Sequence, residues 1–181
     1  QIQSIIDNKA LAEKVIKYNL PVKEFFEITT EKGNKLNAWM IKPNDFDANK
    51  KYPVFMYQYS GPGSQQVDNK WNTANDYWFM MLSQLGYITV CVDGRGTGFK
   101  GAAFKKVTQK QLGKLEVEDQ IDAANVIGNY TYVDKSRIGI FGWSYGGFMS
   151  SNCLFKGAEV FKMAIAVAPV TNWRFYDSIY T

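Results

Sequence analysis

The 181-residue sequence predicts an α/β fold, in which a mostly parallel sheet carries helices on both faces. Two observations lead to this prediction. Segments of strand type alternate with segments of helix type through most of the chain. After residue 53 the strand segments are continuous apolar runs, which are typical of strands buried on both faces. With 46% hydrophobic and 21% charged residues, the chain is long enough for one domain with a hydrophobic core.

The first half of the chain is expected to begin with a linker. Residues 1–22 mix polar and apolar positions, and Leu11, Val15 and Ile16 would line one side of a short helix that ends before Pro21. Alternation of polar and apolar residues, and then buried apolar runs, follow. The expected elements are strands at 26–29, 36–41 and 54–57, an aromatic helix at about 75–85, and a strand at 87–92.

The second half continues the alternation of helices and strands. A helix is expected over residues 115–128, because carboxylates lie near its start and apolar residues follow at helical spacing. A short strand at 137–141, a helix from Tyr145 onward and a buried strand at 163–168 complete the pattern.

Residues 142–146 carry the most informative motif, GWSYG, which fits the pattern G-x-S-x-G. An expected strand precedes it and an expected helix follows. This context is that of the nucleophile elbow of α/β-hydrolases, a tight turn that exposes a strained serine. Ser144 is therefore the candidate nucleophile, and the N-terminal amides of the following helix would favour negative charge beside it.

A serine nucleophile also needs two donors for the oxyanion that forms during acyl transfer. One donor is expected to be the backbone N–H of Tyr145, the residue after the nucleophile. The second normally comes from a loop after an earlier strand, here residues 59–62, which lack a run of glycines. The phenol of Tyr59 is an attractive second donor, but an ordinary packed tyrosine accounts for the sequence equally well.

An aromatic stripe lies near the end of the chain. Trp173, Tyr176 and Tyr180 have the spacing i, i+3 and i+7 of one helix face, and Val170 precedes them. A stripe of this kind is more often part of a core than of a pocket. It does follow a strand end, which is where α/β proteins place their sites.

The charged residues exclude some classes of function. The net charge of +4 comes from interspersed residues without a basic stripe, so no nucleic-acid partner is expected. Cys91 and Cys153 lack metal-site spacing, and no metal or cofactor is expected. Glu116, Glu118 and Asp119 could form a metal or acid/base site. We favour helix N-terminal carboxylates that face solvent or nearby amides.

Asp93 and Arg95 follow the strand at 87–92. Charged residues at a strand end could touch a substrate. We favour a structural role, in which the two residues brace the loops near the site through a local ion pair.

Several motifs together give the chain a family resemblance. It resembles the dipeptidyl peptidase IV branch of the prolyl oligopeptidase family from its first residues to its last. The matching stretches are residues 142–147 (GWSYGG), 59–62 (YSGP), 93–98 (DGRGTG), 117–120 (VEDQ), 166–170 (AVAPV), Trp173 and 176–181 (YDSIYT). Other branches of the family replace Trp143 and Tyr145.

The resemblance implies a β-propeller joined to an α/β-hydrolase domain that releases dipeptides from free N-termini after proline or alanine. Residues 1–22 would then enter from an upstream domain, and residues 23–181 would be part of the hydrolase domain. Tyr59 would be the side-chain oxyanion donor. The residues implied to line an apolar pocket for the penultimate proline are Tyr145, Val170, Trp173, Tyr176 and Tyr180. Rigid rings suit proline because they exclude water without offering hydrogen bonds.

The sequence contains no histidine, although a serine nucleophile usually needs a nearby base. In this fold the triad order is Ser, Asp, His, so both partners are expected beyond Thr181. The glutamates that bind the substrate amine are expected upstream of Gln1. This chain by itself is therefore expected to be inactive. The resemblance also implies a homodimer of the full-length protein and a place outside the cytoplasm.

Two other functions remain open. The first is a same-fold esterase or acyl-peptide hydrolase, which a requirement for a free amine would separate from a dipeptidyl peptidase. The second is a non-catalytic binding protein that has kept the fold. The intact Ser144 argues against the second function.

Overall fold

A computed structural model describes residues 5–71 and 73–180. Helices and strands alternate along most of the chain, as the sequence predicts. The elements are α1 (Lys9–Lys17), β1 (Lys23–Thr29), β2 (Lys35–Ile41), β3 (Tyr52–Tyr57), α2 (Ala74–Gln84), β4 (Ile88–Asp93), α3 (Ala102–Lys106), α4 (Leu115–Gly128), β5 (Val133–Trp143), α5 (Tyr145–Lys156), β6 (Phe161–Val167) and a 3₁₀ turn (Trp173–Phe175).

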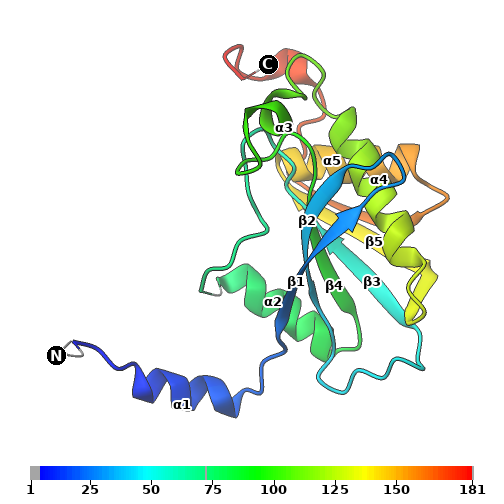
Figure 1. The fold of residues 1–181 in the computed structure, drawn as a ribbon. Helices are drawn as coiled ribbons and strands as arrows, with labels where there is room; N and C mark the ends of the chain where they lie inside the picture. Colours follow the sequence, from blue (N-terminus) through cyan, green and yellow to red (C-terminus); the bar gives the residue numbers. More distant parts are fainter. Residues whose placement is uncertain (1–4, 72, 181) are drawn as a thin grey trace.

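The strands form one mixed sheet in the order β1-β2-β4-β3-β5-β6 (Figure 1). β4, β3, β5 and β6 run parallel to one another, whereas β1, β2 and β4 pair antiparallel. The predicted α/β-hydrolase class with a mostly parallel sheet is therefore confirmed. The two alternating strands near the start of the chain add a hairpin at one edge, and α3 is an element that the sequence did not predict.

Helices cover both faces of the sheet (Figure 1). Alternate side chains of each strand point to opposite faces. In β3, Val54 and Met56 pack into the core that α4 and α5 cover, whereas Phe55 packs with Phe79 and Met80 of α2. Because β3 is buried on both faces of the sheet, its sequence is a continuous apolar run.

The first helix differs from the others in its burial. None of the residues of α1 is buried, and the helix extends away from the sheet (Figure 1). Leu11 is 46% exposed and Ile16 is 76% exposed. The expected helix is present, but its apolar side does not reach the core of the described residues.

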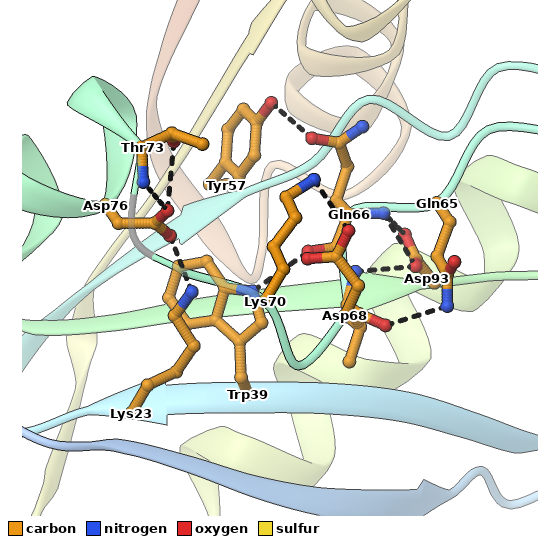
Figure 2. Close-up of polar contacts among 11 residues, drawn as sticks. Lys23, Trp39, Tyr57, Gln65, Gln66, Asp68, Lys70, Thr73, Asp76 and Asp93 are labelled. Atoms are coloured by element: carbon orange, nitrogen blue, oxygen red, sulfur yellow. Dashed lines mark hydrogen bonds and ion pairs between the residues drawn. The ribbon is translucent and has the colours of Figure 1, made fainter. Parts of the chain in front are cut away.

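The long loop between β3 and α2 is fastened to the sheet (Figure 2). The carboxylate of Asp93 accepts the N–H groups of Gln66 and Val67, with its Oδ2 2.9 and 2.8 Å from the two nitrogens. The phenol of Tyr57 donates to Oε1 of Gln66 at 2.9 Å, and the indole of Trp39 donates to the carbonyl of Gln66 at 3.2 Å. These bonds hold the loop that begins just after the end of β3.

Candidate active site

Ser144 lies in a strained turn between β5 and α5, with φ 57° and ψ −114°. Non-glycine residues rarely adopt positive φ, and such strain is concentrated at functional sites. The Ser144 N–H donates to the carbonyl of Val167 at 2.9 Å, and the Ser144 carbonyl accepts the N–H of Phe148 at 3.0 Å. The strand, turn and helix that the G-x-S-x-G motif requires are therefore all present, and Ser144 is half-buried within them.

The two flanking glycines leave no room for side chains. A Cβ on Gly146 would lie 2.6 Å from the carbonyl oxygen of Gln58. A Cβ on Gly142 would collide with the carbonyl of Gly146 and lie 2.6 Å from Nε2 of Gln58. A side chain at either position would therefore collide with neighbouring backbone or side-chain atoms, and glycine at both positions allows the turn to be tight.

Tyr59 lies two residues after the end of β3 and is half-buried. Its ring centroid lies 6.2 Å from that of Tyr145. The next residue, Ser60, has φ 62°, so the chain turns sharply after Tyr59. A Cβ on Gly61 would lie 2.5 Å from the Tyr59 ring and 3.4 Å from the Tyr180 hydroxyl. The structure therefore brings Tyr59 beside the residue that follows Ser144.

Two of the three aromatic residues near the end of the chain contact the ring of Tyr145, and the third, Tyr176, packs on those two. Ring centroids are 5.5 Å apart for Tyr145 and Trp173, 6.4 Å for Tyr145 and Tyr180, and 5.4 Å for Trp173 and Tyr176. Trp173 and Tyr180 stack at 5.8 Å. Burial, together with nearby Tyr59, raises the pKa of the Tyr180 phenol to about 12.

The helix predicted for this stripe is wrong. Only a 3₁₀ turn forms at Trp173–Phe175, and Tyr176 has an extended backbone. The side chain of Asn172 accepts the N–H of Arg174, and that of Asp177 accepts the N–H of Ile179. Such local side-chain bonds compete with a helix. The rings meet through this folded loop instead of along one helix face.

Phe148 belongs to the ring cluster although the sequence did not single it out. Its ring lies 5.5 Å from Tyr145 and 5.2 Å from Trp173, edge to face in both pairs. Its position one helical turn after Ser144 was the available signal. Val170 is half-buried in the segment between β6 and Trp173.

The sequence favoured carboxylates that face solvent or nearby amides in α4, and two of the three are buried instead of facing solvent, although Asp119 does accept the backbone N–H of Arg95 at 2.7 Å. Glu116 is fully buried, and its Oε1 accepts the phenol of Tyr145 at 2.6 Å. Asp119 is also fully buried and binds the guanidinium of Arg95, while Glu118 is only half-buried. Burial, and then the Glu116 carboxylate, raise the pKa of Tyr145, so the phenol remains a donor.

The ion pair expected between Asp93 and Arg95 does not form. Arg95 pairs with Asp119, with Nη2 2.7 Å from Oδ1. Asp93 instead fastens the loop after β3. Burial raises the pKa of Asp93 to about 6, and the hydrogen bonds from Val67 and Gln66 limit that rise. Asp93 and Arg95 do brace loops near the site, but with partners that sequence spacing could not identify.

Within residues 5–71 and 73–180, no group of three or more histidine, cysteine, aspartate or glutamate side chains is arranged to hold a metal ion. Cys91 and Cys153 are free and buried. No helix in the same residues has the length and apolar character needed to cross a bilayer.

Comparisons with known proteins identify relatives along almost the whole chain. A probable dipeptidyl-aminopeptidase B from Podospora anserina is 48% identical over 176 residues, which are 97% of this chain and 19% of that protein. A probable dipeptidyl peptidase 4 from Aspergillus flavus is 42% identical over 181 residues, which are 99% of this chain and 24% of that protein. The chain therefore spans a quarter or less of these relatives.

A solved structure gives the same result. The crystal structure of Porphyromonas gingivalis dipeptidyl peptidase 4 is 50% identical, with a TM-score of 0.93 over 98% of this chain and 25% of that one. The model of the prolyl oligopeptidase family matches residues 71–181, which include the strained Ser144 and the ring cluster. The chain thus belongs to the dipeptidyl peptidase IV branch of the prolyl oligopeptidase family.

Proposed function

We propose that the full-length protein that contains this chain is a serine exopeptidase, which releases dipeptides after proline or alanine from peptides with a free N-terminus. The carrying observation is the strained turn at Ser144, with Tyr59 and the aromatic cluster packed on the residue that follows it. The relatives named as dipeptidyl peptidases support the reaction class.

In this proposal the hydroxyl of Ser144 attacks the carbonyl carbon of the scissile bond, the C–N bond breaks and the amine leaves with a proton from the base. Water then hydrolyses the acyl-enzyme and releases the dipeptide. The Tyr145 N–H and the Tyr59 phenol stabilise the oxyanion of the tetrahedral intermediate. The chain has no histidine, so the base that takes the Ser144 proton comes from residues outside this span, as does the carboxylate that orients it. Tyr59 suits its role because its ring is held between Gly61 and Tyr145.

The aromatic cluster would bind the penultimate residue of the substrate. Trp173 and Tyr180 stack, and Tyr145 closes one side as a fully packed ring. Tyr176 and Tyr180 keep 45% and 38% of their surface exposed, so ring faces remain available to a ligand. Rigid apolar walls favour a proline ring, which brings no hydrogen-bond donor into the pocket. Val170 is proposed as a further wall.

A substrate comparison tests this proposal in the full-length protein. Release of the anilide from Gly-Pro-anilide is measured beside N-acetyl-Gly-Pro-anilide and a simple acyl ester. Release from the free-amine peptide alone supports a dipeptidyl peptidase. Turnover of the acetylated peptide or the ester at a similar rate contradicts it and favours the same-fold acyl hydrolase. No turnover of any of the three favours a binding protein.

A further inference from the structure

A fully buried glutamine connects the two halves of the candidate active site. Gln58 lies between β3 and Tyr59, and none of its surface is exposed. Its Nε2 donates to the carbonyl of Gly146 at 2.7 Å and lies 3.0 Å from Oγ of Ser150, both in α5. Its backbone N–H donates to the carbonyl of Phe141 in β5 at 3.1 Å. Gln58 is therefore bonded to the strand that enters the serine turn and to the helix that leaves it.

The atoms around these hydrogen bonds are closely packed. The carbonyl oxygen of Gln58 and the Cα of Tyr59 would lie 2.6 and 3.2 Å from a Cβ on Gly146. Nε2 of Gln58 occupies the space beside Gly142. The chain segment that carries Tyr59 therefore touches the backbone on both sides of Ser144, and a shift of one segment moves the other.

The side-chain amide of Gln58 is hydrogen-bonded through one of its two arms in the described part of the chain. Among the described residues, Oε1 of Gln58 is buried without a hydrogen-bond partner. A buried acceptor without a partner destabilises the folded state relative to an apolar side chain of similar volume. The contribution of the Gln58 side chain therefore rests on the two bonds that its Nε2 makes to α5.

We propose that Gln58 is a positioning residue for the oxyanion site, in which its bond to the Gly146 carbonyl fixes the distance between the Tyr59 phenol and the Tyr145 N–H. Tyr59 is adjacent to Gln58 in the chain, and Tyr145 is adjacent to Gly146. Oxyanion donors act only when they lie within hydrogen-bond distance of the oxygen, so a small misplacement lowers the rate. This inference rests on the oxyanion roles in the proposed function.

The test uses the full-length protein with Gln58→Met, which keeps the length of the side chain and removes the donor. Three quantities are measured: kcat and KM for Gly-Pro-anilide, the rate at which a fluorophosphonate labels Ser144, and the unfolding midpoint. We expect kcat and the labelling rate to fall about 10- to 100-fold. KM should change by less than about twofold, because no substrate contact is lost, and the midpoint reports how much of the variant is folded under the assay conditions.

Ser150→Ala is the matched control, because it removes the second partner of Gln58 and leaves the bond to Gly146. Its kcat and labelling rate should stay within about twofold of wild type. Unchanged kcat in Gln58→Met, or a loss equal to the fraction of unfolded protein, would overturn the proposal. An equal loss in Ser150→Ala would do the same, since the Gly146 bond would then not be the cause.

Gln58→Glu keeps the proposal testable if Gln58→Met does not fold. Its protonated carboxyl can donate to the Gly146 carbonyl, but its carboxylate cannot. Burial at this position raises the pKa of a glutamate, so more of it is protonated at about pH 5.5 than at about pH 8.5, and the labelling rate relative to wild type should be higher at the lower pH. A ratio that stays low at both values contradicts the proposal.

The labelling measurement separates failure of this inference from failure of the proposed function. Wild-type protein that labels at Ser144 but leaves Gly-Pro-anilide intact contradicts the dipeptidyl peptidase assignment. The effect of Gln58→Met on labelling still decides the role of Gln58 in that case. Wild-type protein that does not label contradicts both.

Discussion

Tyr145 contributes to the candidate site through three of its parts. Its N–H is the proposed oxyanion donor, its ring is the centre of the aromatic cluster, and its phenol is bonded to buried Glu116. Because its ring is packed and its phenol is hydrogen-bonded, the side chain of Tyr145 is well suited to keep the backbone amide of this residue in position. The bond to Glu116 ties α4 to the turn at Ser144, which gives a buried carboxylate in α4 a clear structural purpose.

Removal of the Tyr59 hydroxyl is expected to slow the chemical step. In the full-length protein, Tyr59→Phe should lower kcat for Gly-Pro-anilide roughly 100-fold and leave KM nearly unchanged, because the phenol acts on the oxyanion and not on the bound substrate. Tyr57→Phe is the matched control, since that phenol donates to Gln66 in the loop. Similar losses in the two variants would contradict the assigned role.

Asp93 gives a prediction about pH. Its pKa in the folded state is about 6, above its ordinary value of 3.8, so the folded protein holds this proton more tightly than the unfolded chain. Ionisation of Asp93 therefore lowers the free energy of unfolding by roughly 2–3 kcal/mol as pH rises from about 4 through 6. Denaturant unfolding across this range should show that loss in wild type and not in Asp93→Asn. Parallel curves would contradict it.

At the scale of elements, periodicity predicted the regular segments well. The helix expected over 115–128 is α4, with the same limits, and the apolar strands follow the predicted order. The failures have a common cause. The stripe at 173–180 had helical spacing, but side chains at Asn172 and Asp177 bond locally, and the rings found partners on Tyr145.

The prediction for the acidic cluster was incomplete for a related reason. Carboxylates at a helix start are usually solvated, and no local pattern announces that Glu116 faces Tyr145 or that Asp119 faces Arg95. The motif at 142–146 and its strand and helix context could be read directly, because the elbow is a local structure. Its partners across the sheet, Gln58 above all, depend on tertiary packing that one sequence does not encode in any short window.

The tight turn predicts a difference between two glycine substitutions. Gly146→Ala forces a Cβ to within 2.6 Å of the Gln58 carbonyl, so it should lower the free energy of unfolding by about 1–3 kcal/mol and abolish most Ser144 labelling. Gly128→Ala in α4 meets only contacts at 3.4 Å or more, and because alanine favours a helix it should lower neither the free energy of unfolding nor the labelling. Denaturant unfolding and labelling measure the two effects, and equal behaviour of the variants would contradict the steric account.

At the scale of the molecule, the sheet brings its working parts to one end. The C-terminal segment and α3 lie together at the end of the sheet where the parallel strands finish (Figure 1). Ser144 follows β5, Tyr59 follows β3, and the aromatic loop follows β6, so three adjacent parallel strands deliver the site. Open α/β sheets place their ligands at this edge. The chain spans a quarter or less of its relatives, and the proposed mechanism takes its base from residues outside this span.

The most direct test of the account asks whether Ser144 is the activated nucleophile. The full-length protein is treated with a fluorophosphonate, digested and mapped by mass spectrometry, with Ser144→Ala beside it. The account predicts one adduct, on the peptide that contains Ser144, and no adduct in the variant. An unlabelled wild-type protein, or an adduct that persists in Ser144→Ala, would contradict it.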